Sequence, residues 1–320
     1  MRLRPCKYIF GPVPSRRLGR SLGVDLVPFK TCTYDCVYCQ LGCTTVRTLE
    51  RKEYVPIGEV FAELDRKLAE GVSPDYVTLA GSGEPTLHSR LGELVAGIKQ
   101  WTRIPLAVLT NGSLLWDAAV RRGLAEADVV IPSLDAGDER LFRYVNRPHP
   151  DLPFGRMIEG LREFRKEFKH QIWLEVFLLG GVTGIEAEVA KIARLTAEIS
   201  PDRVQLNTVA RPPAESFALP VPKEQMERFA AMFGVPAEVV ADYHGPEANV
   251  VAAVRSDSIL GLLRRHPCTA AEIAGGLGLH TNEVLKCLAI LMRDGSVASQ
   301  MVSGNLCYRV PADCKGSLAH

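Results

Sequence analysis

Short apolar runs alternate with helical patterns along most of the chain. Runs typical of strands span residues 21–27, 76–80, 106–110, 129–133, 172–178 and 203–207. Between them, apolar residues recur at helical spacing over residues 57–70, 91–101, 115–125, 154–168 and 189–199. Six strands, each followed by a crossover, predict an α/β fold with a parallel sheet and helices outside it. The alternation fits both a partial barrel and a doubly wound open sheet.

Glycine and polar residues gather where the predicted strands end. They are Gly81–Leu87, Thr110–Ser113, Ser133–Asp135 and Asn207 with Thr208 and Arg211. Enzymes with parallel sheets build their sites at the carboxyl ends of the strands, so we expect the functional residues there. The stretch 11–19, dense in Gly, Pro and Arg, predicts a loop.

Three cysteines, Cys32, Cys36 and Cys39, directly follow the first predicted strand. Thiolates this close together can converge on one soft metal centre. A [4Fe–4S] cluster held by three thiolates keeps one iron open for chemistry, and Cys43 as a fourth ligand would close it. A zinc knuckle or plain buried thiols remain alternatives on the spacing alone.

Composition and charge narrow the class of protein. The 320 residues are 47% apolar, which suffices for a large domain and a small one. Nine unevenly spaced cysteines, no leader-like start and no membrane-length apolar run predict a cytoplasmic protein with reduced thiols and no membrane partner. Residues 1–55 carry a net charge of +6 and the remainder −5. This basic segment either attracts an anionic substrate such as RNA or is a solvated surface.

The cysteine loop, with Tyr38 before the last cysteine, resembles the radical S-adenosylmethionine (SAM) superfamily. The resemblance implies a partial (β/α)6 TIM-type barrel and a [4Fe–4S] cluster bound by Cys32, Cys36 and Cys39. It also implies that the free iron chelates SAM and that an electron from the cluster cleaves SAM to a 5'-deoxyadenosyl radical. A low-potential donor such as a flavodoxin or ferredoxin would supply that electron.

The resemblance extends to residues that would bind SAM. Gly81-Ser82-Gly83-Glu84-Pro85 resembles the superfamily's Gly-Gly-Glu-Pro element, whose main chain would bond the SAM ammonium while Glu84 supports it by charge. The resemblance further implies that Asn111 and Ser133 contact SAM and that Asp135 binds substrate or a sugar hydroxyl. Asn207 would complete the far wall of the site with Arg211. A role as a cap or turn residue would also explain each of these residues. His88 is expected to be a surface imidazole rather than a proton shuttle.

Composition changes past residues 243–246, which predicts two domains, 1–245 and 250–320. Helical patterns over 258–265, 269–277 and 281–293, followed by a two-stranded wing over 297–310, resemble winged helix-turn-helix modules. The presumptive recognition helix carries no net charge, so docking of a protein partner or RNA is at least as well supported as DNA binding. This part also contains four cysteines, Cys268, Cys287, Cys307 and Cys314. We expect them to be small buried side chains rather than ligands of a second metal.

Several blocks look closest to the branch that contains tRNA 4-demethylwyosine synthase and related uncharacterised iron–sulfur oxidoreductases. They are the Gly-Glu-Pro turn, Thr110-Asn111, Ser133–Ala136 and Arg147-Pro148, within about residues 10–215. Only Cys6 precedes Cys32, whereas the synthase has further N-terminal cysteines, which puts its pyruvate condensation in doubt here. The sequence therefore predicts a radical SAM enzyme acting on a macromolecule, preferably RNA or tRNA. Alternatives are a redox-sensing DNA-binding regulator and a modifier of a protein partner.

Overall fold

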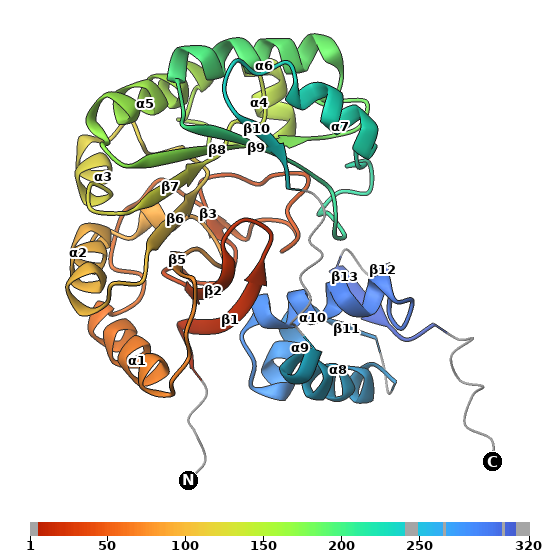
Figure 1. Cartoon of the computed structure of the whole chain (residues 1–320). Coiled ribbons are helices and arrows are strands. Elements are labelled where there is room, and N and C mark those ends of the chain that lie inside the picture. Colours follow the sequence, from red (N-terminus) through yellow and green to blue (C-terminus); the bar gives the residue numbers. More distant parts are fainter. Residues whose placement is uncertain (1–5, 241–248, 265–266, 303–304, 312–320) are drawn as a thin grey trace.

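Most of the chain forms one eight-stranded sheet in the order β1-β2-β5-β6-β7-β8-β9-β10 (Figure 1). The computed structural model describes residues 6–240, 249–264, 267–302 and 305–311. The strands are β1 (Ile9–Ser15), β2 (Gly19–Val24), β5 (Tyr76–Leu79), β6 (Leu106–Thr110), β7 (Val129–Pro132), β8 (Gln171–Leu178), β9 (Arg203–Thr208) and β10 (Ala237–Val239). All neighbours from β2 to β10 pair in parallel, and β1 pairs antiparallel with β2.

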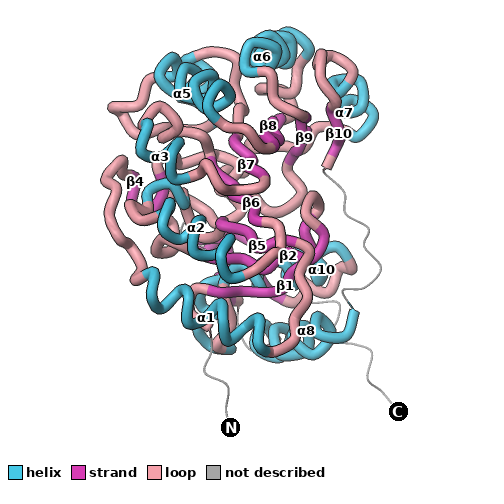
Figure 2. The backbone as a smooth tube through the Cα atoms, turned by 60° about the vertical axis from the view of Figure 1, so that its left-hand side comes forward, coloured by secondary structure: helices cyan, strands magenta, loops and turns pink. Residues whose placement is uncertain are grey.

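The strand order follows the chain order without a reversal. A doubly wound sheet reverses its order at a switch point, so that alternative is wrong. Figures 1 and 2 show the helices along the outer side of the curved sheet. They are α1 (Ile57–Ala69), α2 (Leu91–Trp101), α3 (Ala118–Gly123), α4 (Glu139–Val145), α5 (Phe154–Glu167), α6 (Glu186–Ile199) and α7 (Lys223–Ala230). One continuous apolar core lies between the sheet and these helices.

The expected loop over residues 11–19 is wrong for most of its length. β1 continues to Ser15 and β2 starts at Gly19, so only a short turn joins them. The pairing shifts register between Phe10 and Val13, and Gly11 has a φ of 98°. A bulge of this kind breaks the period-two alternation that identifies a strand in sequence. The irregularity therefore concealed β1.

The C-terminal part has its own apolar cluster, built around Ile259, Ile273, Val284, Leu288 and Tyr308. Its elements are α8 (Asn249–Leu263), α9 (Ala270–Leu277), α10 (Thr281–Arg293) and a sheet in the order β11-β13-β12, comprising β11 (Cys268–Thr269), β12 (Ala298–Val302) and β13 (Asn305–Arg309). The helix expected over 258–265 is the end of the longer α8. The expected boundary at 243–246 and the wing tip at 303–304 fall outside the described residues.

Helix α10 packs against the β1–β2 hairpin, as Figure 1 shows. The Gly11 amide donates to Glu283 Oε1 at 2.8 Å, and Lys286 Nζ donates to the Pro14 carbonyl at 2.7 Å. His280, which caps α10, stacks on Phe10 with ring centroids 4.4 Å apart. The polar face of α10 therefore contacts the sheet. No helix in the described ranges is long and apolar enough to cross a membrane.

Candidate active site

The loop that carries the three cysteines is closed at its base. Strands β3 (Thr31–Cys32) and β4 (Val46–Arg47) pair in parallel, and the Thr48 amide donates to the Cys32 carbonyl at 3.0 Å. Within the loop, the Asp35 carboxylate accepts from the Thr44 amide at 2.6 Å. These bonds fix the two ends of residues 32–45 to each other, and the loop follows the first parallel strand, β2, as the sequence predicts.

Main-chain bonds also hold the loop against segments that are distant from it in sequence. The Val37 amide donates to the Val145 carbonyl at 2.9 Å, and the Asp35 amide donates to the Asn146 carbonyl at 3.0 Å. The Glu215 amide donates to the Val37 carbonyl at 2.9 Å. The loop is therefore supported by the end of α4 and by the segment after β9, neither of which is near it in sequence.

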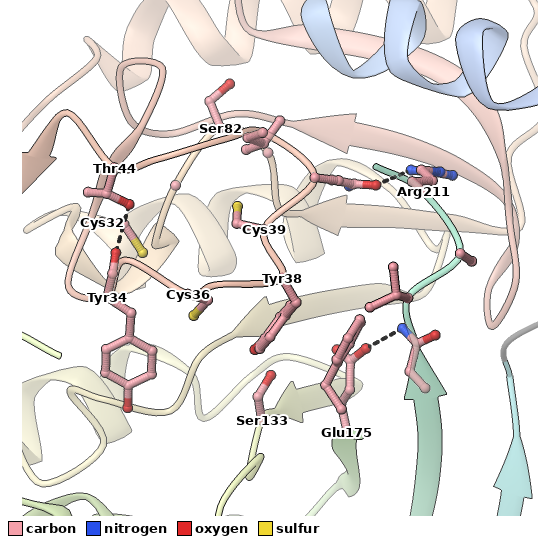
Figure 3. A pocket seen from close by; sticks show the side chains of 18 of the residues that line it. Cys32, Tyr34, Cys36, Tyr38, Cys39, Thr44, Ser82, Ser133, Glu175 and Arg211 are labelled. Atoms are coloured by element: carbon pink, nitrogen blue, oxygen red, sulfur yellow. Dashed lines mark hydrogen bonds between the residues drawn. The ribbon is translucent and has the colours of Figure 1, made fainter. Parts of the chain in front are cut away.

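Cys32, Cys36 and Cys39 line one cavity of about 300 Å³ (Figure 3). Each sulfur accepts a hydrogen bond from a different side chain. Asn111 Nδ2 lies 3.6 Å from Cys32 Sγ, Asn146 Nδ2 lies 3.6 Å from Cys36 Sγ, and Lys30 Nζ lies 3.3 Å from Cys39 Sγ. A thiolate accepts such bonds far better than a thiol, so this donor set suits metal-bound sulfur.

Burial disfavours charge on two of these thiols in the protein alone. Burial, with the neighbouring charge of Glu84, raises the pKa of Cys32 to about 12. Burial, with Asp135, raises the pKa of Cys36 well above its ordinary value. Metal binding deprotonates a coordinating thiol, because the cation supplies the missing positive charge. A bound metal would therefore favour the thiolate forms of Cys32 and Cys36, which burial alone disfavours.

A single-ion site does not account for the trio. Among the described residues, no three His, Cys, Asp or Glu side chains are grouped closely enough to hold one metal ion. Cys43 is exposed and does not line the cavity, so it does not supply a fourth ligand in this arrangement. The geometry thus does not favour the zinc-knuckle alternative, which needs four close ligands.

The turn after β5 packs directly onto the cysteine loop. The Lys30 amide donates to the Ser82 carbonyl at 2.8 Å, and the Glu84 amide donates to the Thr31 carbonyl at 3.2 Å. A Cβ at Gly83 would lie 1.8 Å from that Thr31 oxygen. Glycine is therefore required at position 83 by the close approach of two backbones. Gly81, Ser82 and Gly83 all line the cavity beside the cysteines.

Glu84 ties this turn to the end of β6. Its Oε1 accepts from Thr86 and from Thr110 Oγ1 at 2.6 Å, and its Oε2 accepts from the Asn111 amide at 2.7 Å. The carboxyl is buried, and burial raises its pKa although four donors favour the charged form. Glu84 therefore holds the Asn111 backbone and borders a second cavity of about 330 Å³ that shares Cys32 and Cys36.

The other predicted site residues divide into two groups. Tyr38 and Asn207 line the first cavity, Asn111 lines the second, and Ser133 lines both. Asp135 lines neither cavity. Its carboxylate accepts from the Tyr38 hydroxyl, from Asn146 Nδ2 at 2.7 Å and from the Phe177 amide at 3.0 Å, and burial raises its pKa to about 6. Asp135 thus supports Tyr38, which stacks on Phe177 at 4.0 Å.

Residues 26–195, just over half of the chain, match the sequence profile of the Radical SAM superfamily. The chain belongs to this superfamily. Its fold is the α/β radical SAM fold with a mostly parallel sheet, and it is an enzyme whose cofactors are a [4Fe–4S] cluster and SAM. Radical SAM enzymes need an electron donor and a substrate, and the arrangement of Cys32, Cys36 and Cys39 around one cavity fits the cluster.

Relatives and solved structures agree with this assignment. The radical SAM chain is 36% identical to a UPF0026 protein of Methanocaldococcus jannaschii over 81% of its own length and 82% of that protein's. It is 39% identical to the protein named GTPase Obg of Brachyspira hyodysenteriae over 95% of its own length, but spans only 45% of that protein. A radical SAM methyltransferase from Sphaerobacter thermophilus has the same fold, with a TM-score of 0.51, 22% identity, and coverage of 68% and 65% of the two chains.

Two side chains that support the site escaped the sequence patterns. Asp25 accepts from the Ser82 amide at 3.0 Å and so positions the turn after β5. Glu175 lies in the cavity wall and binds Arg17 through two bonds of 2.9 and 2.6 Å. A charged residue inside the otherwise apolar run 172–178 was the available signal for Glu175.

The expectation of a surface imidazole at His88 is wrong. The side chain is fully buried, and its Nε2 lies 2.9 Å from the Val55 carbonyl. Its Nδ1 accepts from the Arg90 amide at 3.3 Å, so the ring is neutral with its proton on Nε2. Burial lowers the pKa of His88. Cys268, Cys287 and Cys307 are buried as expected, and Cys314 lies outside the described residues.

Proposed function

We propose that Cys32, Cys36 and Cys39 bind the cluster and that SAM lies between them and the Gly81–Glu84 turn. A cluster held there would supply the one electron that reductive cleavage of SAM to methionine and a 5'-deoxyadenosyl radical requires, and that radical would take hydrogen from the substrate. The observation that carries the proposal is that three cysteine sulfurs, each with its own N–H donor, share one cavity with this turn.

The chain's other residues then have separate tasks. The backbone of Gly81, Ser82 and Gly83 lines the cavity and is available to bind a ligand ammonium group. Glu84 holds this backbone in place by its bonds to the residues at the end of β6. Residues that line the cavities and would contact SAM are Tyr38, Asn111, Ser133 and Asn207. Asp135 acts through Tyr38 as a positioning residue.

For the substrate we propose RNA, in line with tRNA modification. Arg16 and Lys30 of the basic segment line the cavity and support an anionic substrate, whereas Arg17 in the same wall is already paired with Glu175. Arg20 and Arg51 instead pair with acidic side chains elsewhere, so the segment does not act as one surface patch. Arg2 and Arg4, which contribute to the charge of the basic segment, lie outside the described residues.

Mass spectrometry of total tRNA and of the proteome from a strain lacking the gene distinguishes RNA from a protein substrate, because the missing modification should appear in only one of the two.

We further infer a barrel domain over residues 1–245 and a winged-helix-like domain over 250–320. The separate apolar cluster and the β12–β13 hairpin support the second unit. DNA regulation is disfavoured because α10, the helix that would read DNA, has seven buried residues and bonds β1 through Glu283 and Lys286. Regulation by redox state would instead require DNA retention that changes with the cluster and no SAM cleavage.

A flavodoxin or ferredoxin in the cytoplasm is the electron donor that we propose. The cysteines of the described ranges are all free thiols, which suits a reducing compartment. A donor of this kind has the low potential that SAM cleavage requires.

Anaerobic reconstitution with iron and sulfide, followed by dithionite and SAM, tests the proposed reaction. The wild type should release 5'-deoxyadenosine and methionine, and Cys39→Ala should release neither. Cys43→Ala is the matched control, because Cys43 is an exposed residue of the same loop. Absence of 5'-deoxyadenosine from fully loaded wild type, or equal yields from both variants, would contradict the proposal.

A further inference from the structure

Four basic side chains from three separate segments meet at the second cavity. Arg16 and Arg17 come from the β1–β2 turn, Arg211 follows β9, and Lys286 comes from α10 of the C-terminal part. Figure 3 shows Arg211 at the edge of the site, beneath a helix of the C-terminal part. The cavity therefore has walls from both parts of the chain.

The basic side chains of this cavity lack a matching number of acids. Glu84 and Glu175 are the acidic side chains lining it in the described part of the chain, and Glu175 already binds Arg17. Arg211 donates to the Gln40 amide oxygen, and Lys286 donates to the Pro14 carbonyl at 2.7 Å. Both acceptors are neutral. Two half-buried basic side chains thus face the cavity, and neither is bonded to a carboxylate among the described residues.

Electrostatics shows the cost of this arrangement. Burial, together with the charges of Arg211, Arg16 and Arg17, lowers the pKa of Lys286 to about 7. Burial and Arg16 lower the pKa of Arg211 to about 10. An oxidised cluster with three thiolates has one net negative charge and SAM one net positive charge, so together they leave the imbalance in place. A bound anion would relieve it.

An unused hydrogen-bond donor lies beside Lys286. Asn282 is one helical turn earlier on α10, so the two side chains share a face. Asn282 lines the same cavity and is only 8% exposed, yet its Nδ2 has no hydrogen-bond partner among the residues described. A buried donor without a partner is costly, which indicates that a ligand supplies the acceptor.

We propose that Asn282, Lys286, Arg211 and Arg16 bind a phosphate group of the substrate, and that the C-terminal domain thereby completes the active site. A phosphate monoester offers three acceptor oxygens and close to two negative charges, which suits donors from three segments of the chain better than a planar carboxylate does. The proposal rests on the proposed function, since it names a feature of that enzyme's substrate. The phosphate belongs either to a small metabolite or to a polynucleotide.

Calorimetric titration of the unreduced, SAM-saturated full chain with inorganic phosphate tests the site. We expect Lys286→Met and Asn282→Leu to weaken binding about tenfold, and the exposed Lys223→Met to leave it unchanged. Asn282→Leu should retain or raise the melting temperature, because it removes an unsatisfied donor, so weaker binding would not reflect unfolding. Wild type that binds no phosphate, phosphate that only competes with SAM, or variants that bind like wild type would overturn the proposal.

Oligoribonucleotides with and without a 5'-phosphate identify the source of the group. Preference for the phosphorylated form supports a terminal phosphate, equal binding of both supports backbone phosphates, and binding of inorganic phosphate alone supports a small metabolite. SAM cleavage is measured in parallel on reduced protein. If the protein cleaves SAM but binds no phosphate, only the proposed phosphate site is contradicted. If it binds phosphate but does not cleave SAM, only the proposed radical chemistry is contradicted.

Discussion

Nε2 of His280 lies 3.2 Å from Oδ2 of Asp25, and both side chains are about nine-tenths buried. The same carboxylate accepts from the Ser82 amide and hydroxyl. Asp25, which directly follows β2, therefore joins the C-terminal part to the turn that lines the proposed SAM site. The two regions are far apart in sequence, so their coupling depends on this contact and on the neighbouring bonds between α10 and β1.

His280→Ala should loosen the docking of α10. The Gly11 amide, which donates to Glu283 across this interface, should then exchange with deuterium about tenfold faster, because a buried bond to a charged group contributes roughly 1.5–3 kcal/mol. Site-resolved hydrogen exchange measures the effect, with exposed His170→Ala as control. Unchanged exchange at Gly11 would show that the His280–Asp25 contact does not hold α10 in place.

Lys30→Met should make the cluster harder to reduce. Lys30 Nζ lies 3.3 Å from Cys39 Sγ, and its positive charge stabilises the reduced, more negative state. A potentiometric titration followed by electron paramagnetic resonance should show a more negative midpoint. Lys52→Met, which removes an exposed lysine paired with Glu50, should not shift it. Equal midpoints in all three proteins would argue against a role for Lys30.

Gly83→Ala should separate the turn after β5 from the cysteine loop. The added Cβ would overlap the Thr31 carbonyl, and we expect a loss of roughly 3 kcal/mol in unfolding free energy together with lower iron content. Gly58→Ala in α1 is the matched control, since nothing lies within 4 Å of its new Cβ. Normal iron loading and stability in Gly83→Ala would contradict the close approach of these two backbones.

Acid should destabilise the protein partly through His88. Burial lowers the pKa of His88 in the folded protein below the ordinary histidine value of about 6.5. As pH falls below that value, the unfolded chain therefore takes up a proton at His88 more readily than the folded protein does. The contribution of neutral His88 to the free energy of unfolding is therefore fully present above about pH 6.5 and is lost as pH falls. The free energy of unfolding changes through this group by at most about 1.4 kcal/mol per pH unit. Urea unfolding at several pH values should give a shallower dependence for His88→Gln, which keeps a donor for Val55. Parallel slopes would refute the neutral, buried assignment.

Local patterns in the sequence predicted the parallel strands and the cysteine loop well. The run 106–110 is β6, and α2 spans the predicted residues 91–101, because each has an unbroken period that local residues determine. The expected turn at Gly81–Pro85 lies beside the cysteines because parallel strands end at one edge.

Long-range pairings could not be predicted in the same way. Arg17 contacts Glu175, 158 residues away, and Lys286 contacts Pro14, 272 residues away, and no periodicity in the sequence indicates such contacts. β1 was missed because a bulge at Gly11 interrupts its alternation. Lys286 lies in the stretch 281–293 that resembles a recognition helix, and only the docking of α10 shows that it lines the cavity.

Mössbauer spectroscopy of iron-labelled protein, recorded with and without SAM, tests most directly whether Cys32, Cys36 and Cys39 leave one iron open. The account predicts a [4Fe–4S] signal in which a single iron site changes on adding SAM, in the wild type and in Cys43→Ala alike. A signal that SAM leaves unchanged, or a cluster retained in full by Cys39→Ala, would contradict it.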